Sequence, residues 1–128
     1  MEVIKFTIPL NPVTKKNSSR ICYNKYSRKP FIMPSKAYEK YQEESGYFLP
    51  CKWRNIDSKV NIKAIYYMGT KRKVDISNLH SALHDVLVHY GVIKDDNSEI
   101  VAGTDGSRVE YDKDNPRTEV EITEIERG

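Results

Sequence analysis

Long apolar runs and paired cysteines are both missing from this 128-residue sequence. No stretch approaches the ~20 consecutive apolar residues that a membrane-spanning helix needs, and the first ten residues alternate polar with apolar side chains instead of forming a signal peptide. Cys22 and Cys51 stand far apart without any CxxC pair, which disfavours a disulfide and favours ordinary reduced thiols. We therefore expect a cytoplasmic protein with no membrane partner.

The length and composition fit one small domain. With 38% hydrophobic and 30% charged residues, the chain has a modest core to bury, because small domains bury a smaller fraction of their surface. The sequence contains no internal repeat and no low-complexity segment. We expect residues 1–128 to form a single domain.

Charges of opposite sign are segregated between the two halves of the chain. Residues 1–74 hold 16 Lys and Arg against 5 Asp and Glu, whereas residues 75–128 hold 5 against 13. This segregation favours a basic surface for a polyanion such as nucleic acid, and acidic positions in the second half that could hold a metal ion. The alternative, which implies no binding partner, is that the two oppositely charged halves form faces of the protein that neutralise each other.

Periodic patterns predict an α+β fold in which a small mixed sheet packs with two helices. Alternating polar and apolar residues predict strands at residues 2–9, 59–68, 107–111 and 118–124. Short apolar segments at 21–23 and 31–33 predict a hairpin that turns through residues 24–29, and 100–102 is a further short strand. Helical spacing begins after Ser35 and again after Ser77, each a predicted N-cap, and ends at Gly46 and Gly91.

Two carboxylates flank the second predicted helix. Asp75 precedes it and Asp96 follows it, and a helix of that length is ~20 Å long. The two side chains can therefore meet only if residues 91–97 fold back towards the helix start, or if two subunits share the site. Converging Asp oxygens beside Lys and Arg suit Mg²⁺-assisted hydrolysis of a phosphodiester. Alternatively, Asp75 interacts with the helix dipole and Asp95 and Asp96 form a solvated turn.

The run VDISNLHSALHDVLVHYGVIKDD, residues 74–96, resembles the signature of the RusA family of Holliday junction resolvases. In that signature, an Asp-x-Asp-Asn-Leu segment opens a helix that continues through Asp-x-Leu to Gly and an Asp-Asp pair. The flanking segments IPLNPVTKKNSSR and RTEVEITEI extend the resemblance over most of the chain. It implies a RusA-like homodimer that cleaves four-way or otherwise branched DNA with Mg²⁺ or Mn²⁺.

The resemblance also implies roles for individual residues. Asp75 matches the family's first catalytic Asp and Asp96 its last, while Asp95 and Asp85 match accompanying acidic positions. Asn78 matches an Asn that we expect to orient the loop through backbone hydrogen bonds.

Two departures from the signature alter the expected site. Ser77 stands where the family usually has its second catalytic Asp, and Ser81 stands where the best-known members have a functional Lys. A serine hydroxyl can ligate Mg²⁺ but brings no negative charge, so we expect weaker metal binding or a single ion. Asp75, Asp96 and Ser77 are the expected metal ligands, and together with Asp95 they are the expected catalytic residues.

Other side chains could compensate for these departures. The candidates are the acidic Asp85, Asp95 and Glu99 for the missing carboxylate, and the basic Lys73, Lys15 and Lys16 for the missing positive charge. The same two departures allow a second function, that of a family member that binds branched DNA without cleaving it, because function depends on the site and not on the fold.

Three basic clusters are expected to contact DNA. They are Lys15, Lys16 and Arg20 in the first loop, Lys25, Arg28 and Lys29 in the hairpin, and Lys71, Arg72 and Lys73 before the second helix. Backbone contacts of this kind give salt-dependent, sequence-tolerant affinity. Tyr23, Tyr26 and Phe31 lie among the hairpin charges, where they could stack on unpaired bases or pack across the strands.

A histidine pair suggests a different function. His80 and His84 are spaced i, i+4, which places both imidazoles on one helix face, as in some zinc sites. No HExxH glutamate or CxxC pair accompanies them, so zinc would have to recruit Cys22, Cys51 or a distant acid. Histidines that face solvent or DNA are the simpler interpretation, and a zinc-binding adaptor domain is the third functional alternative.

Overall fold

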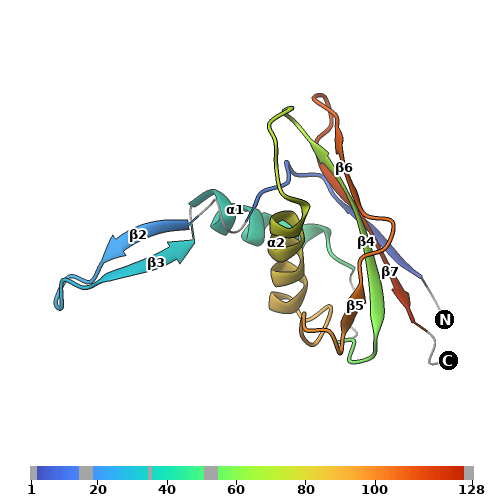
Figure 1. Ribbon diagram of the computed structural model, residues 1–128, viewed down its shortest axis with the longest axis horizontal. Helices are drawn as coiled ribbons and strands as arrows, with labels where there is room; N and C mark the ends of the chain where they lie inside the picture. Colours follow the sequence, from blue (N-terminus) through green and yellow to red (C-terminus); the bar gives the residue numbers. More distant parts are fainter. Residues whose placement is uncertain (1–2, 15–18, 35, 51–54, 126–128) are drawn as a thin grey trace.

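The computed structural model describes residues 3–14, 19–34, 36–50 and 55–125, without the side chains of residues 19–22 and 31–34. A mixed sheet carries two helices on one face, and a two-stranded hairpin projects from the molecule (Figure 1). The elements are β1 (Ile4–Ile8), β2 (Ser19–Tyr23), β3 (Pro30–Pro34), α1 (Lys36–Ser45), the 3-10 helix η2 (Gly46–Phe48), β4 (Val60–Met68), α2 (Ile76–His89), β5 (Val101–Gly103), β6 (Arg108–Tyr111) and β7 (Arg117–Glu124). This confirms the predicted α+β class.

In the chain, α2 connects β4 to β5, two strands that pair in parallel. β7 lies between β1 and β4 and is antiparallel to both. β5 and β6 both pair in parallel with the other edge of β4, β5 at its Val60 end and β6 opposite residues 65–68. The chain leaves β4, forms α2 and returns to β5, and this parallel crossover lays α2 across the sheet.

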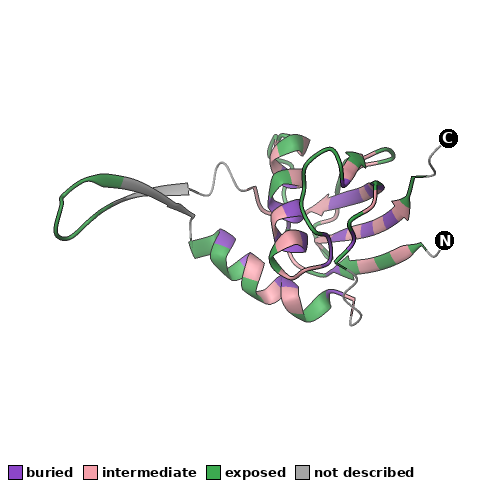
Figure 2. Ribbon diagram, turned by 90° about the horizontal axis from the view of Figure 1, so that it is seen from below, coloured by how far each residue is buried: buried purple, intermediate pink, exposed green. Residues whose placement is uncertain are grey.

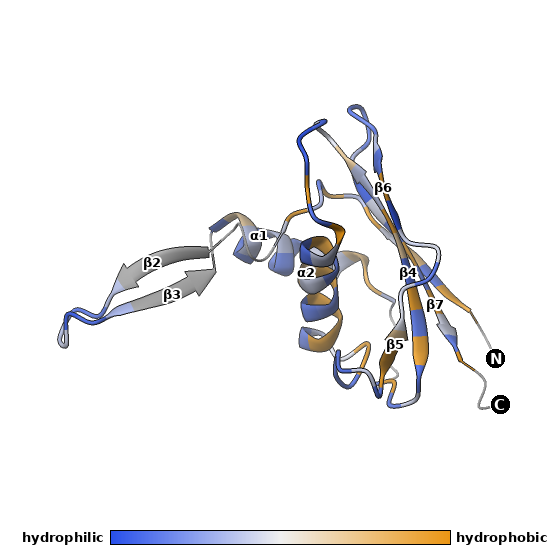
Figure 3. Ribbon diagram, in the orientation of Figure 1, coloured by the Kyte–Doolittle hydropathy of each residue, from blue (hydrophilic) through white to orange (hydrophobic). Residues whose placement is uncertain are grey.

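The core lies between α2 and the inner face of the sheet. Alternate residues of β4 are buried, as the period-2 pattern predicts, and Figure 3 shows the apolar positions of α2 and of the sheet. The fully or almost fully buried residues of these elements include Val60, Ile62, Ala64, Tyr66, Leu79, Ala82, Leu83, Val86, Leu87, Val120 and Ile122. Burial of each large apolar side chain stabilises the folded state by roughly 1.5–3 kcal/mol. The packing of α2 on the sheet is therefore strong enough to fix where both ends of the helix lie.

The two ends of α2 differ in how well the sequence predicted them. Gly91 has φ +74, and the N–H groups of Val92 and Gly91 donate to the carbonyls of Leu87 (2.9 Å) and Val88 (3.1 Å), which is a Schellman ending. At the other end, the prediction of Ser77 as the N-cap is wrong. The helix begins at Ile76 with Asp75 as N-cap, because Asp75 has extended backbone angles (φ −82, ψ 124). Ser35 lies outside the described residues.

Helix α1 packs beside α2 and is attached to it by hydrogen bonds. The Tyr90 hydroxyl donates to the carbonyl of Gln42 (2.8 Å), so the end of α2 is joined to the end of α1. A Cβ on Gly46 would approach the Tyr90 ring to within 2.6 Å, so glycine permits this close contact. No helix within the described ranges is both long and apolar enough to traverse a bilayer.

Candidate functional site

Asp75 and Asp96 lie at opposite ends of α2. Asp75 precedes the first helical residue and is exposed, and Asp95 and Asp96 are exposed in the turn that follows the helix. The 14 residues of α2 span about 21 Å. Figure 1 shows the connection before α2 and the turn after it at opposite ends of the sheet.

The segment after α2 is fixed at the far end by backbone pairing. Ile56 and Ile93 form a parallel bridge, in which the Lys94 N–H donates to the carbonyl of Ile56 (2.8 Å) and the Ile56 N–H to that of Val92 (3.1 Å). Val92 and Ile93 are buried there. Residues 91–97 therefore do not fold back towards Asp75, and that route to a site within one chain is excluded.

One chain alone does not assemble the expected metal site. Mg²⁺ takes oxygen ligands at about 2.0–2.1 Å, so Asp75 and Asp96 of the same chain cannot share an ion. Across the described residues, no three His, Cys, Asp or Glu side chains are grouped where they could hold a metal ion. The residues fit a metal only if another molecule completes the ligand set.

The Asp75 end combines acidic, hydroxyl and basic groups. Ser77 is exposed in the first turn of α2, where backbone N–H groups and the helix dipole favour anions. The preceding loop carries exposed Arg72 and Lys73 and is linked to the loop after β1, because the Gly69 N–H donates to Asn11 Oδ1 (3.1 Å). Between these loops is a pocket of about 330 Å³, lined by Asn11, Pro12, Thr14, Met68, Thr70, Arg72, Lys73 and Val74. Cationic side chains beside a carboxylate suit the binding of a phosphodiester.

The Asp96 end is a short acidic turn ordered by its own side chains. Asp95 Oδ1 accepts a hydrogen bond from the Asp96 N–H (2.7 Å), and Asn97 Oδ1 accepts one from the Glu99 N–H (2.9 Å). Asp95, Asp96 and Glu99 are all exposed. Their charges are therefore directed to the surface and available to a second molecule.

Two further positions of the signature are placed in different surroundings. Asp85 accepts hydrogen bonds from the Tyr38 hydroxyl and from Gln42 Nε2 (3.4 Å), both on α1. It therefore joins the two helices, and compensation by Asp85 for the missing carboxylate at Ser77 stays a prediction. Asn78 lies in the first turn of α2, where its N–H donates to the Asp75 carbonyl (3.1 Å).

Among the basic residues predicted to contact DNA, those with described side chains form two separate groups. Lys25, Arg28 and Lys29 are exposed in the turn of the β2–β3 hairpin, and Lys71, Arg72 and Lys73 are exposed in the loop between β4 and α2. Figure 1 shows the hairpin turn and this loop in separate parts of the molecule. The Lys71 Nζ lies 5.1 Å from the centre of the Tyr111 ring. The third predicted cluster is not described in the same detail: Lys15 and Lys16 lie outside the described residues, and Arg20 lies in β2 without a described side chain.

His84 is buried and His80 is half-buried, which corrects the interpretation that the pair faces solvent. His84 is 8% exposed and its ring stacks on that of His80, with centroids 5.5 Å apart. His80 Nδ1 and the Tyr66 hydroxyl share a hydrogen bond of 2.7 Å, whereas His84 Nε2 is buried without a hydrogen-bond partner among the described residues. Burial, and then the neighbouring His80, lower the pKa of His84 to about 4.

The zinc interpretation gains no support from this arrangement. No third His, Cys, Asp or Glu joins the histidine pair within the described part of the chain. The Cys22 side chain and Cys51, the cysteines that such a site would recruit, lie outside the described side chains. The packing of α2 against β4, where His80 bonds Tyr66 and stacks on His84, explains the position of both rings without a metal ion.

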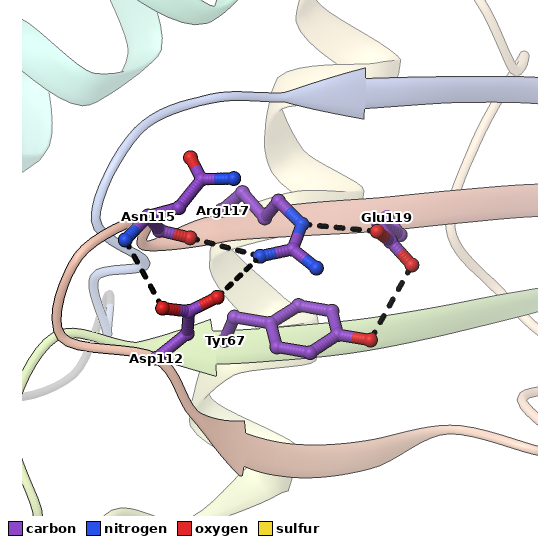
Figure 4. A network of polar contacts seen from close by, with 5 residues as sticks. All are labelled: Tyr67, Asp112, Asn115, Arg117 and Glu119. Carbon is purple, nitrogen blue, oxygen red and sulfur yellow. Dashed lines mark hydrogen bonds and ion pairs between the residues drawn. The ribbon is translucent and has the colours of Figure 1, made fainter.

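A polar network on the outer face of the sheet was not anticipated from the sequence (Figure 4). Arg117 donates to Glu119 (2.9 Å), Asp112 (2.9 Å) and the Asn115 carbonyl (3.0 Å), and its guanidinium lies 3.7 Å from the centre of the Tyr67 ring. The hydrogen bond from Arg117 lowers the pKa of Asp112. The alternation of Arg117 and Glu119 along β7 was the available signal. Because these charges satisfy one another, the network stabilises the β6–β7 turn.

Comparison with known proteins supports the resemblance in the 74–96 signature. The family model described as endodeoxyribonuclease RusA matches residues 9–123. The match includes the hairpin, both ends of α2 and most of β7. No curated protein matches the chain.

Proposed function

Because the chain belongs to the RusA endodeoxyribonuclease family, we propose that it is a Mg²⁺-dependent enzyme that cleaves Holliday junctions or other branched DNA by phosphodiester hydrolysis. The observation that carries this proposal is the pair of exposed acidic ends on α2, one of them beside Arg72 and Lys73. Acidic oxygens next to cations suit both an ion and a phosphate.

The active unit we propose is a homodimer with shared sites. Since about 21 Å of helix separates Asp75 from Asp96 within one chain, Asp75 of one subunit is completed by Asp96 of the partner subunit. Two-fold symmetry then creates two equal sites, because each contact between the subunits occurs twice. Two equal sites suit paired nicks in a symmetric junction.

Each residue has a distinct role in this proposal. Asp75, Ser77 and the partner's Asp96 hold Mg²⁺, with Mn²⁺ as a substitute, and Asp95 adds negative charge beside Asp96. When bound, the ion supplies charge neutralisation and a lower pKa for water. Arg72 and Lys73 hold the phosphate, and the N–H groups at the start of α2 orient it.

Cleavage of a synthetic four-way junction tests the function. Purified protein should nick the junction in Mg²⁺ or Mn²⁺ and leave it intact in EDTA, with much less nicking of a linear duplex of the same sequence. Denaturing gels of end-labelled strands provide the measurement. An unmutated protein that does not nick DNA in either metal would contradict the nuclease assignment.

The alternative is a member of the family that binds branched DNA without cleaving it. The neutral Ser77 at the second acidic position favours it, because the ion then has fewer charged ligands. Junction binding in a gel-shift assay without any nicking would support this alternative. Stoichiometric zinc in the purified protein would instead support the adaptor.

Ser77→Asp is expected to lower the Mg²⁺ concentration that gives half-maximal cleavage by about tenfold, since it adds a charged oxygen ligand. The measurement is a Mg²⁺ titration of the nicking rate. Ser77→Asn is the matched control, because it is polar but uncharged and should leave the Mg²⁺ requirement near that of the unmutated protein. An unchanged requirement in Ser77→Asp would remove Ser77 from the ligand set.

A further inference from the structure

The β2–β3 hairpin ends in a basic turn that carries two exposed tyrosines. The hairpin projects away from the sheet and the helices, and its described turn is exposed (Figure 2). Tyr23, at the end of β2, is 71% exposed, and Tyr26 in the turn is 95% exposed. The alternative in which Tyr26 packs across the hairpin strands is therefore wrong. A single exposed aromatic residue is ordinary, so its surroundings decide its role.

The turn has an ordered backbone. Asn24 Oδ1 accepts hydrogen bonds from the N–H groups of Tyr26 (2.9 Å) and Ser27 (3.1 Å). The Asn24 N–H donates to the Lys29 carbonyl (3.0 Å), and the Asn24 carbonyl accepts from the Arg28 N–H (2.9 Å). Arg28 adopts φ +57, a left-handed conformation that is unfavourable for a residue with a Cβ. Because the backbone of Tyr26 is already ordered, binding through it requires little further ordering.

The charge around Tyr26 identifies the class of partner. Residues 3–38 contain no Asp or Glu, and the exposed Lys25, Arg28 and Lys29 flank Tyr26 in the sequence. Proteins bind nucleic acid with exposed bases through aromatic side chains that lie among cations. The cations contact phosphates, and the aromatic ring stacks on a base. A second copy of the chain offers the acidic turn at residues 94–99, but that turn contains only polar and charged residues and no surface for the ring.

We propose that Tyr26 stacks on an exposed base face at the branch point of DNA, while Lys25, Arg28 and Lys29 contact the adjacent phosphates. This inference rests on the proposed action on branched DNA. A continuous duplex keeps its base faces covered by neighbouring pairs, whereas a branch point and a single strand expose them. The hairpin therefore contributes selectivity for branched over linear DNA, at a distance from the acidic ends of α2.

Binding of Tyr26→Ala to three DNAs tests the inference. In EDTA, its affinity for a four-way junction and for a single strand should fall roughly tenfold, since alanine substitution of a stacking residue costs roughly 5- to 150-fold. Its affinity for a duplex with closed ends should fall much less. Tyr26→Trp should keep the affinity for all three. Tyr47→Ala is the matched control, because Tyr47 is 81% exposed on η2, outside the hairpin.

Three outcomes would overturn the inference. Equal losses on all three DNAs would show a phosphate contact or a structural role instead of stacking. Dissociation of a dimer by Tyr26→Ala in sedimentation would assign the turn to a contact between copies. If the unmutated protein nicks the junction and Tyr26→Ala binds it equally well, this inference alone fails. If the unmutated protein neither prefers nor nicks the junction, the proposed function fails.

Discussion

A mixture of Asp75→Asn and Asp96→Asn chains is expected to cleave a four-way junction that neither variant cleaves alone. Each variant alone should lose roughly 10³-fold or more in rate, because a metal ligand supplies several kcal/mol of transition-state stabilisation. In a mixed dimer, one shared site has both substitutions and the other is intact. Random exchange makes about half of the dimers mixed, so about a quarter of all sites are active.

The measurement is the nicking rate after the two variants have been mixed, denatured and refolded together. Asp105→Asn is the matched control, because Asp105 is an exposed carboxylate in the loop between β5 and β6 and has no role in the proposed site. It should cleave at the rate of the unmutated protein. Full loss in both single variants without recovery on mixing would contradict the shared site.

Acidification from pH 7 to pH 4 is expected to remove about 3 kcal/mol of folding stability through His84. The ordinary pKa of 6.5 is lowered to about 4 by burial and by His80, and each pKa unit corresponds to about 1.4 kcal/mol. Because the folded state resists protonation that the unfolded state accepts, this stability is complete above pH 6.5 and is lost as the pH falls towards 4.

Urea unfolding across this pH range provides the measurement. The carboxylates also titrate there, so the informative quantity is the difference in unfolding free energy between the unmutated protein and His84→Gln. That difference should change by about 3 kcal/mol between pH 7 and pH 4. His89→Gln is the control, because His89 is exposed at the end of the same helix. A pH dependence shared by all three proteins would show that His84 does not titrate as proposed.

Periodicity was informative wherever a side chain faces either the core or solvent. The alternation in residues 59–68 placed Val60, Ile62, Ala64 and Tyr66 on one face, and all four are buried in β4. The apolar spacing of α2 likewise predicted its buried face. Helix starts were less certain, because Asp75 and Ser77 are both good N-cap residues. The extended backbone of Asp75 selected it.

Packing between elements determined the surroundings of the second helix. The i, i+4 spacing placed His80 and His84 on one face, but the sequence does not show which neighbours cover that face. Likewise, the sequence does not show that Asp85 accepts hydrogen bonds from Tyr38 and Gln42 of α1. Such contacts join residues more than 40 positions apart, so local patterns carry no signal for them.

The acidic residues around α2 show this division most clearly. The sequence alone determined that Asp75 and Asp96 flank one amphipathic helix in a RusA-like signature, because motif and helix length are local properties of the chain. Only the tertiary structure decided that they stay apart. The Ile56–Ile93 bridge and the burial of Val92 and Ile93 hold the second acidic turn at the far end of the helix. That bridge depends on pairing between distant segments, which no spacing within residues 74–96 encodes.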